Sequence, residues 1–299
     1  MNAPKARVDG LEARPIGEGT PRQSVLEHLA RNLRLNVALS FRALVRLIQS
    51  PAPWRSRAIQ SHAIIIWSIM LCAAVATSMF VFDTAALDWA RQEPNWFRNA
   101  FETITDFGLS GWFLFPCGII LLFLAAVISP RLAALSQGAL AALAARFGFL
   151  FLAVALPGLF VSIVKRLIGR ARPYVGGHEN PFHYVPFSWR PEFASMPSGH
   201  ATTAVAAAIA IGAIWPRTRP VMWIYAVTIM FSRVAVLAHH PSDVIAGAVV
   251  ALVGTHLLRR WFAARRLVFR ASDLRAKPAP SMLRIKATLR QAISAISAG

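Results

Sequence analysis

The sequence predicts an all-α, polytopic membrane protein with six transmembrane helices. First, 56% of its 299 residues are hydrophobic, which is more than an ordinary soluble domain of this size contains. Second, these residues gather in six apolar segments, each close to the length of about 20 residues that a helix needs to cross a bilayer. Third, the 32 Lys and Arg residues, against 13 Asp and Glu, cluster beside these segments, where anionic lipid headgroups attract them.

The six apolar segments form one predicted membrane domain, residues 61–260. They cover residues 63–82, 109–128, 147–164, 198–215, 221–238 and 241–258. The last three are short, so an alternative interpretation makes them buried helices of a soluble all-α protein. The stretches 83–108 and 166–197 are rich in aromatic residues, and we expect them to be loops on one side of the membrane.

The two ends of the chain are more basic and less apolar. Residues 1–20 are expected to form a disordered tail. Residues 21–60 open with a capping box at 24–27 and repeat apolar residues every three or four positions, with Arg in between. This pattern predicts a basic amphipathic helix at the membrane interface, with a partner-binding helix as the alternative. Residues 261–299 are expected to form a basic cytoplasmic tail that is poorly ordered towards its end.

The distribution of positive charge predicts the orientation. Twelve basic residues flank the segments on the side that both termini share, against seven on the other side. This excess favours both termini in the cytoplasm, with anionic lipid headgroups at the basic flanks. Because six spans alternate in direction, the ends of the third and fifth and the starts of the fourth and sixth meet on the non-cytoplasmic face. Nucleic acid is not expected as a partner, since the basic residues adjoin apolar segments.

Three short strings fall at those four helix ends. They are Lys165-x6-Arg172-Pro173, Pro197-Ser198-Gly199-His200 and Ser232-Arg233-x5-His239-x3-Asp243. The guanidinium groups of Arg172 and Arg233 and the ammonium group of Lys165 suit the oxygens of a phosphate. Ser198 and Gly199 stand where a helix begins, so backbone N–H groups can bind the same anion. These five residues are the predicted phosphate-binding site.

Two histidines and an acid supply the predicted chemistry. His239 precedes Asp243 by four residues, so the carboxylate can accept the proton of one imidazole nitrogen and leave the other nitrogen to attack phosphorus. His200 is the candidate general acid for the leaving oxygen. The expected course is a phosphohistidine on His239, hydrolysed by a water molecule that His200 activates. His240 is discounted, because its spacing to Asp243 is three residues.

A metal site is the rival interpretation of two histidines and an aspartate. Three cations that converge on the same place, Lys165, Arg172 and Arg233, would repel a divalent ion. We therefore expect neither a metal nor another cofactor.

The three strings resemble the signature of the type 2 phosphatidic acid phosphatase superfamily, whose motifs read K-x6-R-P, P-S-G-H and S-R-x5-H-x3-D. Every fixed position is present between residues 165 and 243. With six apolar segments around it, the chain is similar to the bacterial integral-membrane branch of that superfamily. The resemblance implies a metal-independent phosphatase with His239 as nucleophile, Asp243 as its partner and His200 as acid and base.

The resemblance also implies the kind of substrate. Bacterial enzymes similar to this one act on isoprenyl pyrophosphates, phosphatidylglycerol phosphate, phosphatidic acid or lipid A phosphates. We therefore expect a lipid phosphatase that hydrolyses a phosphomonoester or a pyrophosphate of a lipid. A lipid-to-lipid phosphotransferase is the alternative within catalysis, and a non-catalytic membrane scaffold or transporter is the alternative outside it.

Overall fold

The computed structural model describes residues 26–27, 29–40, 61–128, 132, 134–175 and 181–297. Most of these residues are helical and none lies in a β-strand, although isolated bridges join Arg170 to Tyr184 and Phe269 to Ala276. The predicted all-α class is therefore confirmed for the described part of the chain. Two predicted segments lie wholly or partly outside the described residues. They are the tail at 1–20 and, within the predicted amphipathic helix, residues 21–25, 28 and 41–60.

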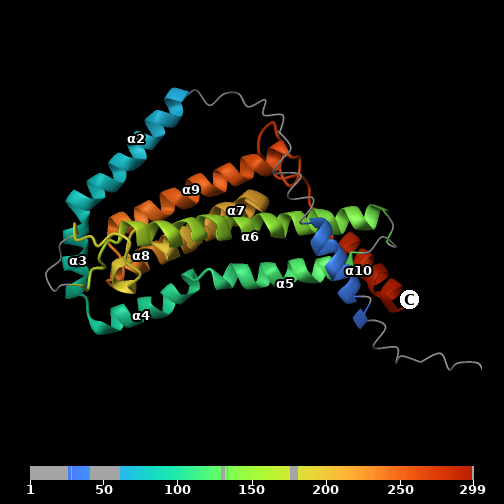
Figure 1. Ribbon diagram of the computed structural model, residues 1–299, viewed down its shortest axis with the longest axis horizontal. Coiled ribbons are helices and arrows are strands. Elements are labelled where there is room, and N and C mark those ends of the chain that lie inside the picture. The colour runs from blue at the N-terminus through green and yellow to red at the C-terminus, as the bar shows by residue number, and fades with distance from the viewer. Residues whose placement is uncertain are drawn as a thin grey trace, which may run out of the picture.

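The helices follow one another with short connections. In chain order they are α2 (Ser61–Thr77), the π-helix η1 (Ser78–Phe82), α3 (Asp83–Gln92), α4 (Asn95–Thr105), the 3₁₀ turn η2 (Asp106–Gly108), α5 (Gly111–Val127), α6 (Ala134–Ile168), η3 (Pro191–Phe193), α7 (Gly199–Ile214), η4 (Pro216–Thr218), α8 (Arg219–Ala235), α9 (Pro241–Ala264) and α10 (Met282–Ser297). Figure 1 shows α5, α6 and α9 along the length of the molecule, with α3 and α4 at one end and α10 at the other.

Helix α7 forms the centre of the bundle, in contact with α6, α8 and α9. Its side chains are mostly small, and those of Ala204, Ala206 and Ala207 are buried against the neighbouring helices. Small side chains let helix backbones approach closely. Gly247 of α9 has the same effect, because a Cβ there would lie 2.4 Å from the carbonyl oxygen of Ser198. The start of α9 therefore packs against the start of α7, which brings two of the three strings together.

Four helical stretches are long and apolar enough to cross a membrane. They are Ile69–Gln92, Asn95–Val127, Leu135–Ile168 and Pro241–Ala264, and Gly199–Ile214 is a shorter apolar helix. Large apolar side chains such as Phe80, Phe115 and Ile119 are exposed on these stretches, as expected where lipid rather than water surrounds the protein. These features confirm the membrane class, whereas the number of six spans stays a prediction.

Residues 83–108, predicted as a loop, are helical in the structure. Their aromatic side chains pack together and onto α8. The ring centroids of Trp89 and Phe97 are 5.9 Å apart, those of Phe97 and Phe101 are 4.8 Å apart, and those of Phe101 and Phe231 are 5.2 Å apart. The aromatic residues that suggested an interfacial loop thus form one face of α3 and α4, and this face covers α8.

The C-terminal part also has more structure than predicted. Helix α10 contacts α5 and α6, and Ser136 Oγ donates to Gln291 Oε1 at 3.0 Å. Nearby, the side chain of Asn36 donates to the carbonyl oxygens of Ala125 and Ile128 at 2.8 and 2.6 Å. The helical residues 29–40 and α10 therefore gather at the end of the bundle opposite to α3 (Figure 1).

Candidate active site

The three strings meet at the end of the bundle that holds α3. Lys165 lies in the last turn of α6, Ser198 caps the start of α7, Arg233 lies in the last turn of α8, and Asp243 lies in the first turn of α9. The backbone N–H of Ser198 donates to the carbonyl oxygen of Asp243 at 2.9 Å. The structure therefore places these four helix ends as the alternation of six antiparallel segments predicted.

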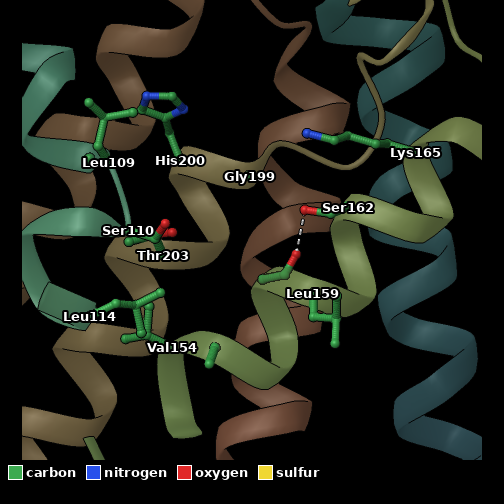
Figure 2. A pocket seen from close by; sticks show the side chains of 13 residues that line it. Leu109, Ser110, Leu114, Val154, Leu159, Ser162, Lys165, Gly199, His200 and Thr203 are labelled. Carbon is green, nitrogen blue, oxygen red and sulfur yellow. Dashed lines mark hydrogen bonds between the residues drawn. The ribbon is translucent and has the colours of Figure 1, made fainter. Parts of the chain in front are cut away.

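A cavity of about 300 Å³ opens between α5, α6 and α7. Figure 2 shows Lys165 and His200 at one end of the cavity, with Leu114, Val154 and Leu159 along its walls. One end of the cavity is thus cationic, and the rest is lined by apolar side chains together with the hydroxyl groups of Ser110, Ser162 and Thr203. A molecule with an anionic headgroup and an aliphatic part fits this arrangement.

Two donors beside the start of α7 are buried and have no hydrogen-bond partner among the described residues, namely the Oγ of Ser198 and the Nε of Arg233. Arg233 is held in place by its Nη1, which donates to Thr105 Oγ1 at 2.6 Å. Arg172 is held by its Nε, which donates to the carbonyl oxygen of Pro191 at 3.1 Å. Buried polar groups are almost always satisfied, so the unpartnered donors indicate a site that an anion completes.

His200, the second residue of α7, belongs to the same site. It lies within electrostatic reach of Lys165, Arg172, Arg233 and His239. The structure therefore gathers the predicted cations and both predicted histidines around one place. Fixed cations around a phosphoryl group stabilise the charge that develops on its oxygens during displacement.

His239 lies in the turn between α8 and α9 and is only 3% exposed. Its Nδ1 is 3.7 Å from Oδ2 of Asp243, which is too long for a hydrogen bond. Burial lowers the pKa of His239 to about 4; the Asp243 carboxylate opposes this shift, and Arg233 and Arg172 add to it. The imidazole is therefore neutral at neutral pH, as a nucleophile must be.

His240, which was discounted on its spacing, is the closer neighbour of Asp243. Its backbone N–H donates to Asp243 Oδ2 at 2.9 Å, and its ring Nδ1 is 3.2 Å from the same oxygen. His240 is the N-cap of α9 and forms a capping box with Asp243. The three-residue spacing is thus the spacing of a helix cap, a role that was not predicted for His240 from the sequence.

Four buried residues around Asp243 were not predicted from the sequence, namely Asp83, Arg170, Ser195 and Ser242. Sequence signals exist for two of them. Asp83 directly follows the apolar segment 63–82, where a charge is costly and therefore usually functional. Arg170 lies inside the six-residue spacer of the first string, which the motif leaves open.

Comparison with known proteins gives the family. Residues 146–267 match the PAP2 superfamily. The chain is 38% identical over 176 residues to a lipid A 1-phosphatase of Rhizobium etli, an overlap that covers 58% of this chain and 74% of that protein. It is 36% identical over 176 residues to a lipid A 1-phosphatase of Rhizobium johnstonii, covering 58% of this chain and 70% of that protein. The crystal structure of a transmembrane PAP2 type phosphatidylglycerolphosphate phosphatase from Bacillus subtilis matches with 21% identity and a TM-score of 0.44, over 66% of this chain and 92% of that chain.

The site and the relatives agree on one class of protein, an integral-membrane phosphatase. The chain belongs to the PAP2 superfamily, the type 2 phosphatidic acid phosphatases. It is a membrane lipid phosphatase of this kind, as the three strings predicted.

Proposed function

We propose that this phosphatase works through a covalent phosphohistidine on His239, with Asp243 and His200 as catalytic partners. The observation that carries the proposal is that three of the buried polar atoms without a hydrogen-bond partner belong to this one site: the Oγ of Ser198, the Nε of Arg233 and the Nδ1 of His239. A phosphate between Arg233 and the start of α7 would satisfy the first two atoms and would place phosphorus beside the imidazole of His239.

The reaction consists of two displacements at phosphorus. In the first, Nε2 of His239 bonds to phosphorus while the bond to the lipid oxygen breaks, and His200 donates a proton to that oxygen. In the second, water attacks the phosphohistidine, His200 takes up a proton of that water, and the P–N bond breaks to release inorganic phosphate. The carboxylate of Asp243, whose Oδ2 lies 3.7 Å from Nδ1 of His239, stabilises the imidazolium by its negative charge. Lys165 and the two arginines of the site hold the phosphoryl oxygens.

The proposed substrate is a lipid A phosphate, with the 1-phosphate as the group removed. Two relatives at 36% and 38% identity are lipid A 1-phosphatases. The cavity beside Lys165 and His200 supports a lipid of some kind, because its apolar wall can hold an aliphatic chain next to the phosphate.

Purified enzyme in detergent should release one phosphate from lipid A 1,4′-bisphosphate and leave the 4′-phosphate in place. Its kcat/KM for this lipid should exceed the values for phosphatidic acid, phosphatidylglycerol phosphate and an isoprenyl pyrophosphate. Each buried methylene of a lipid tail adds at most about 0.8 kcal/mol of binding free energy, which soluble phosphate esters cannot gain. Phosphate release and ³¹P spectra of the product measure both points. A nucleotide that outperforms every lipid, or loss of the 4′-phosphate alone, contradicts the proposed substrate.

Activity should survive exhaustive treatment with EDTA, and vanadate should inhibit it. The proposed site uses Lys165, Arg172 and Arg233 where metal-dependent phosphatases use an ion. Within the described ranges, no group of three or more His, Cys, Asp or Glu side chains is arranged to hold a metal ion. Initial rates before and after chelation test this point. Loss of activity that one specific divalent ion restores would overturn the metal-free mechanism.

The proposed topology has six spans, both termini in the cytoplasm, and the site on the periplasmic side of an inner membrane. The excess of basic residues on the flanks near both termini supports this orientation, since anionic headgroups attract them. The arrangement of the helices supports a site and a C-terminal part on different sides of the membrane, because α10 and the proposed catalytic helix ends lie at opposite ends of the bundle (Figure 1).

Single cysteines at Ser188 and Ser272 should label oppositely in intact cells. Ser188 lies in the loop before α7, and Ser272 follows α9 at the other end of the bundle. Cys72 and Cys117 are replaced first, so that only the introduced thiol can react. A membrane-impermeant maleimide should modify Ser188→Cys in spheroplasts and should modify Ser272→Cys only after lysis. The reverse pattern would place the site in the cytoplasm.

A further inference from the structure

A buried polar network lies behind the proposed catalytic histidine. It joins Asp83 at the start of α3, Arg170 after α6, Ser195 before α7, and Ser242 and Asp243 in the first turn of α9. The side chains of all five residues are fully buried. Four separate parts of the chain thus contribute charged or polar groups to one place, although burial of charge is costly unless the charges are paired.

Arg170 bridges the two acids of this network. Its Nη2 donates to Asp83 Oδ2 at 2.7 Å, and its Nη1 donates to Asp243 Oδ1 at 2.6 Å. Its Nε donates to the carbonyl oxygen of Pro181 at 2.9 Å. Burial alone would lower the pKa of Arg170, but the carboxylates of Asp243 and Asp83 outweigh burial and raise it. The guanidinium is therefore a fixed positive charge between two carboxylates.

Asp83 reaches α9 by a second route. The backbone N–H of Ser242 donates to Asp83 Oδ1 at 2.9 Å, and the Oγ of Ser242 donates to Asp83 Oδ2 at 2.6 Å. An acid at this place satisfies a first-turn N–H group and is favoured by the positive end of the helix dipole. Asp83 therefore fixes the start of α9, the turn that carries His240 and Asp243, from a different helix.

The charges in the network do not cancel. Two carboxylates share one guanidinium, which leaves one negative charge that faces the histidines. Oδ2 of Asp243, which Arg170 does not bind, accepts a hydrogen bond from Ser195 Oγ at 2.5 Å and lies 3.7 Å from Nδ1 of His239. Without the Asp83 carboxylate, Asp243 alone would pair with the positive charge of Arg170. The Asp243 carboxylate would then stabilise an imidazolium at His239 less.

We propose that Asp83 and Arg170 are positioning residues, which act through Asp243 to hold its carboxylate in place and to keep its negative charge available to His239. The inference rests on the proposed mechanism, in which Asp243 stabilises the His239 imidazolium. Neither residue is among the groups that line the cavity at the phosphate end. Their loss should therefore lower kcat and leave KM nearly unchanged.

The test is a double-mutant cycle of Asp83→Asn and Arg170→Gln. Each rate is measured on lipid A bisphosphate or on phosphatidic acid, whichever the unmodified enzyme hydrolyses faster. Asp83→Asn keeps the shape of the side chain and should lower kcat on the order of 10- to 100-fold, as loss of an outer partner of a catalytic group does in other sites. Arg170→Gln should lower kcat further. The double variant should be more active than Arg170→Gln by roughly tenfold, because it again leaves Asp243 with an unshared negative charge.

The pH profile separates this role from a merely structural one. Besides Arg170 and Asp83, the titratable groups around Asp243 are His239, His240 and Tyr184. In Arg170→Gln, two buried carboxylates face each other without a cation and should share a proton. The kcat of this variant should therefore rise between about pH 6 and pH 9, and the double variant should not show this rise.

Arg190→Gln is the matched control, since it makes the same substitution in the same loop on an exposed side chain. It should leave kcat, KM and the pH profile unchanged. Retention of normal kcat in Asp83→Asn overturns the inference, and so does a cycle whose effects simply add. If Arg170→Gln does not fold, as judged by its Tm in detergent, the kcat and KM of Asp83→Asn decide alone. Failure of the mechanism itself would appear separately, as activity that survives His239→Ala.

Discussion

Replacement of His239 by alanine should reduce phosphate release to the background of the assay. In the proposed mechanism the imidazole of His239 forms the bond to phosphorus, and no other group in the site can replace that bond. The residue is buried and neutral at neutral pH, since burial lowers its pKa to about 4. The variant should keep its Tm and should still bind inorganic phosphate, because in the proposed site Arg233 and the start of α7 hold the anion. Steady-state rates together with phosphate binding separate loss of chemistry from loss of the site.

His240→Ala is the comparison that gives this result its meaning. His240 contacts Asp243 more closely than His239 does, at 3.2 Å against 3.7 Å. If His240 acts as a helix cap, its loss should cost about 0.5–2 kcal/mol of stability and should leave substantial turnover. His183→Ala, on an exposed residue of the loop before α7, should behave like the unmodified enzyme. Near-normal turnover in His239→Ala, with turnover abolished in His240→Ala, would show that the nucleophile is His240 and not His239.

Replacement of His200 by alanine should lower kcat by roughly 10²- to 10⁴-fold, the usual contribution of a general acid–base group. His200 lies within reach of the three cations and of His239, at the cationic end of the cavity. In the proposed mechanism it has two roles, as acid for the leaving lipid oxygen and as base for the attacking water. A substrate with a good leaving group needs only the second role.

This difference makes the His200 prediction sharper. With a nitrophenyl phosphate ester as substrate, His200→Ala should form the phosphoenzyme quickly and hydrolyse it slowly. Stopped-flow absorbance should then show a burst of nitrophenol equal to the enzyme concentration, followed by a slow steady rate. A variant that shows no burst and retains full steady-state activity would remove His200 from both steps.

The sequence predicted the placement of the site better than the shape of the fold around it. A predicted alternation in the direction of the apolar segments, which can be counted from sequence alone, was enough to bring the three strings to one face. Lys165, Ser198, Arg233 and Asp243 therefore lie at neighbouring helix ends, as predicted. Helices α3 and α4 were missed because their aromatic residues suit an interfacial loop equally well. The contacts of Trp89 and Phe101 with Phe231 show that they cover α8.

The network of Asp83 and Arg170 could not be predicted for a different reason. Its ion pairs join residues 87 and 73 positions apart in the chain. No local pattern fixes such a distance, because it depends on how α3 packs against α9. The geometry around Asp243 was similarly hidden, because residues three and four positions before a carboxylate can both face it at a helix start. The choice between His239 and His240 depends on side-chain conformation as well as on spacing.

The most direct test of the central claim is to trap the phosphoenzyme. The His200→Ala variant is mixed with a nitrophenyl phosphate ester, quenched in alkali, where a phosphohistidine survives, and digested for mass spectrometry. The account predicts one phosphoryl group, located on His239, which is absent when the same experiment is done with His239→Ala and His200→Ala combined. Phosphate found on His240 or on another residue, or a burst with no phosphorylated peptide, would contradict it.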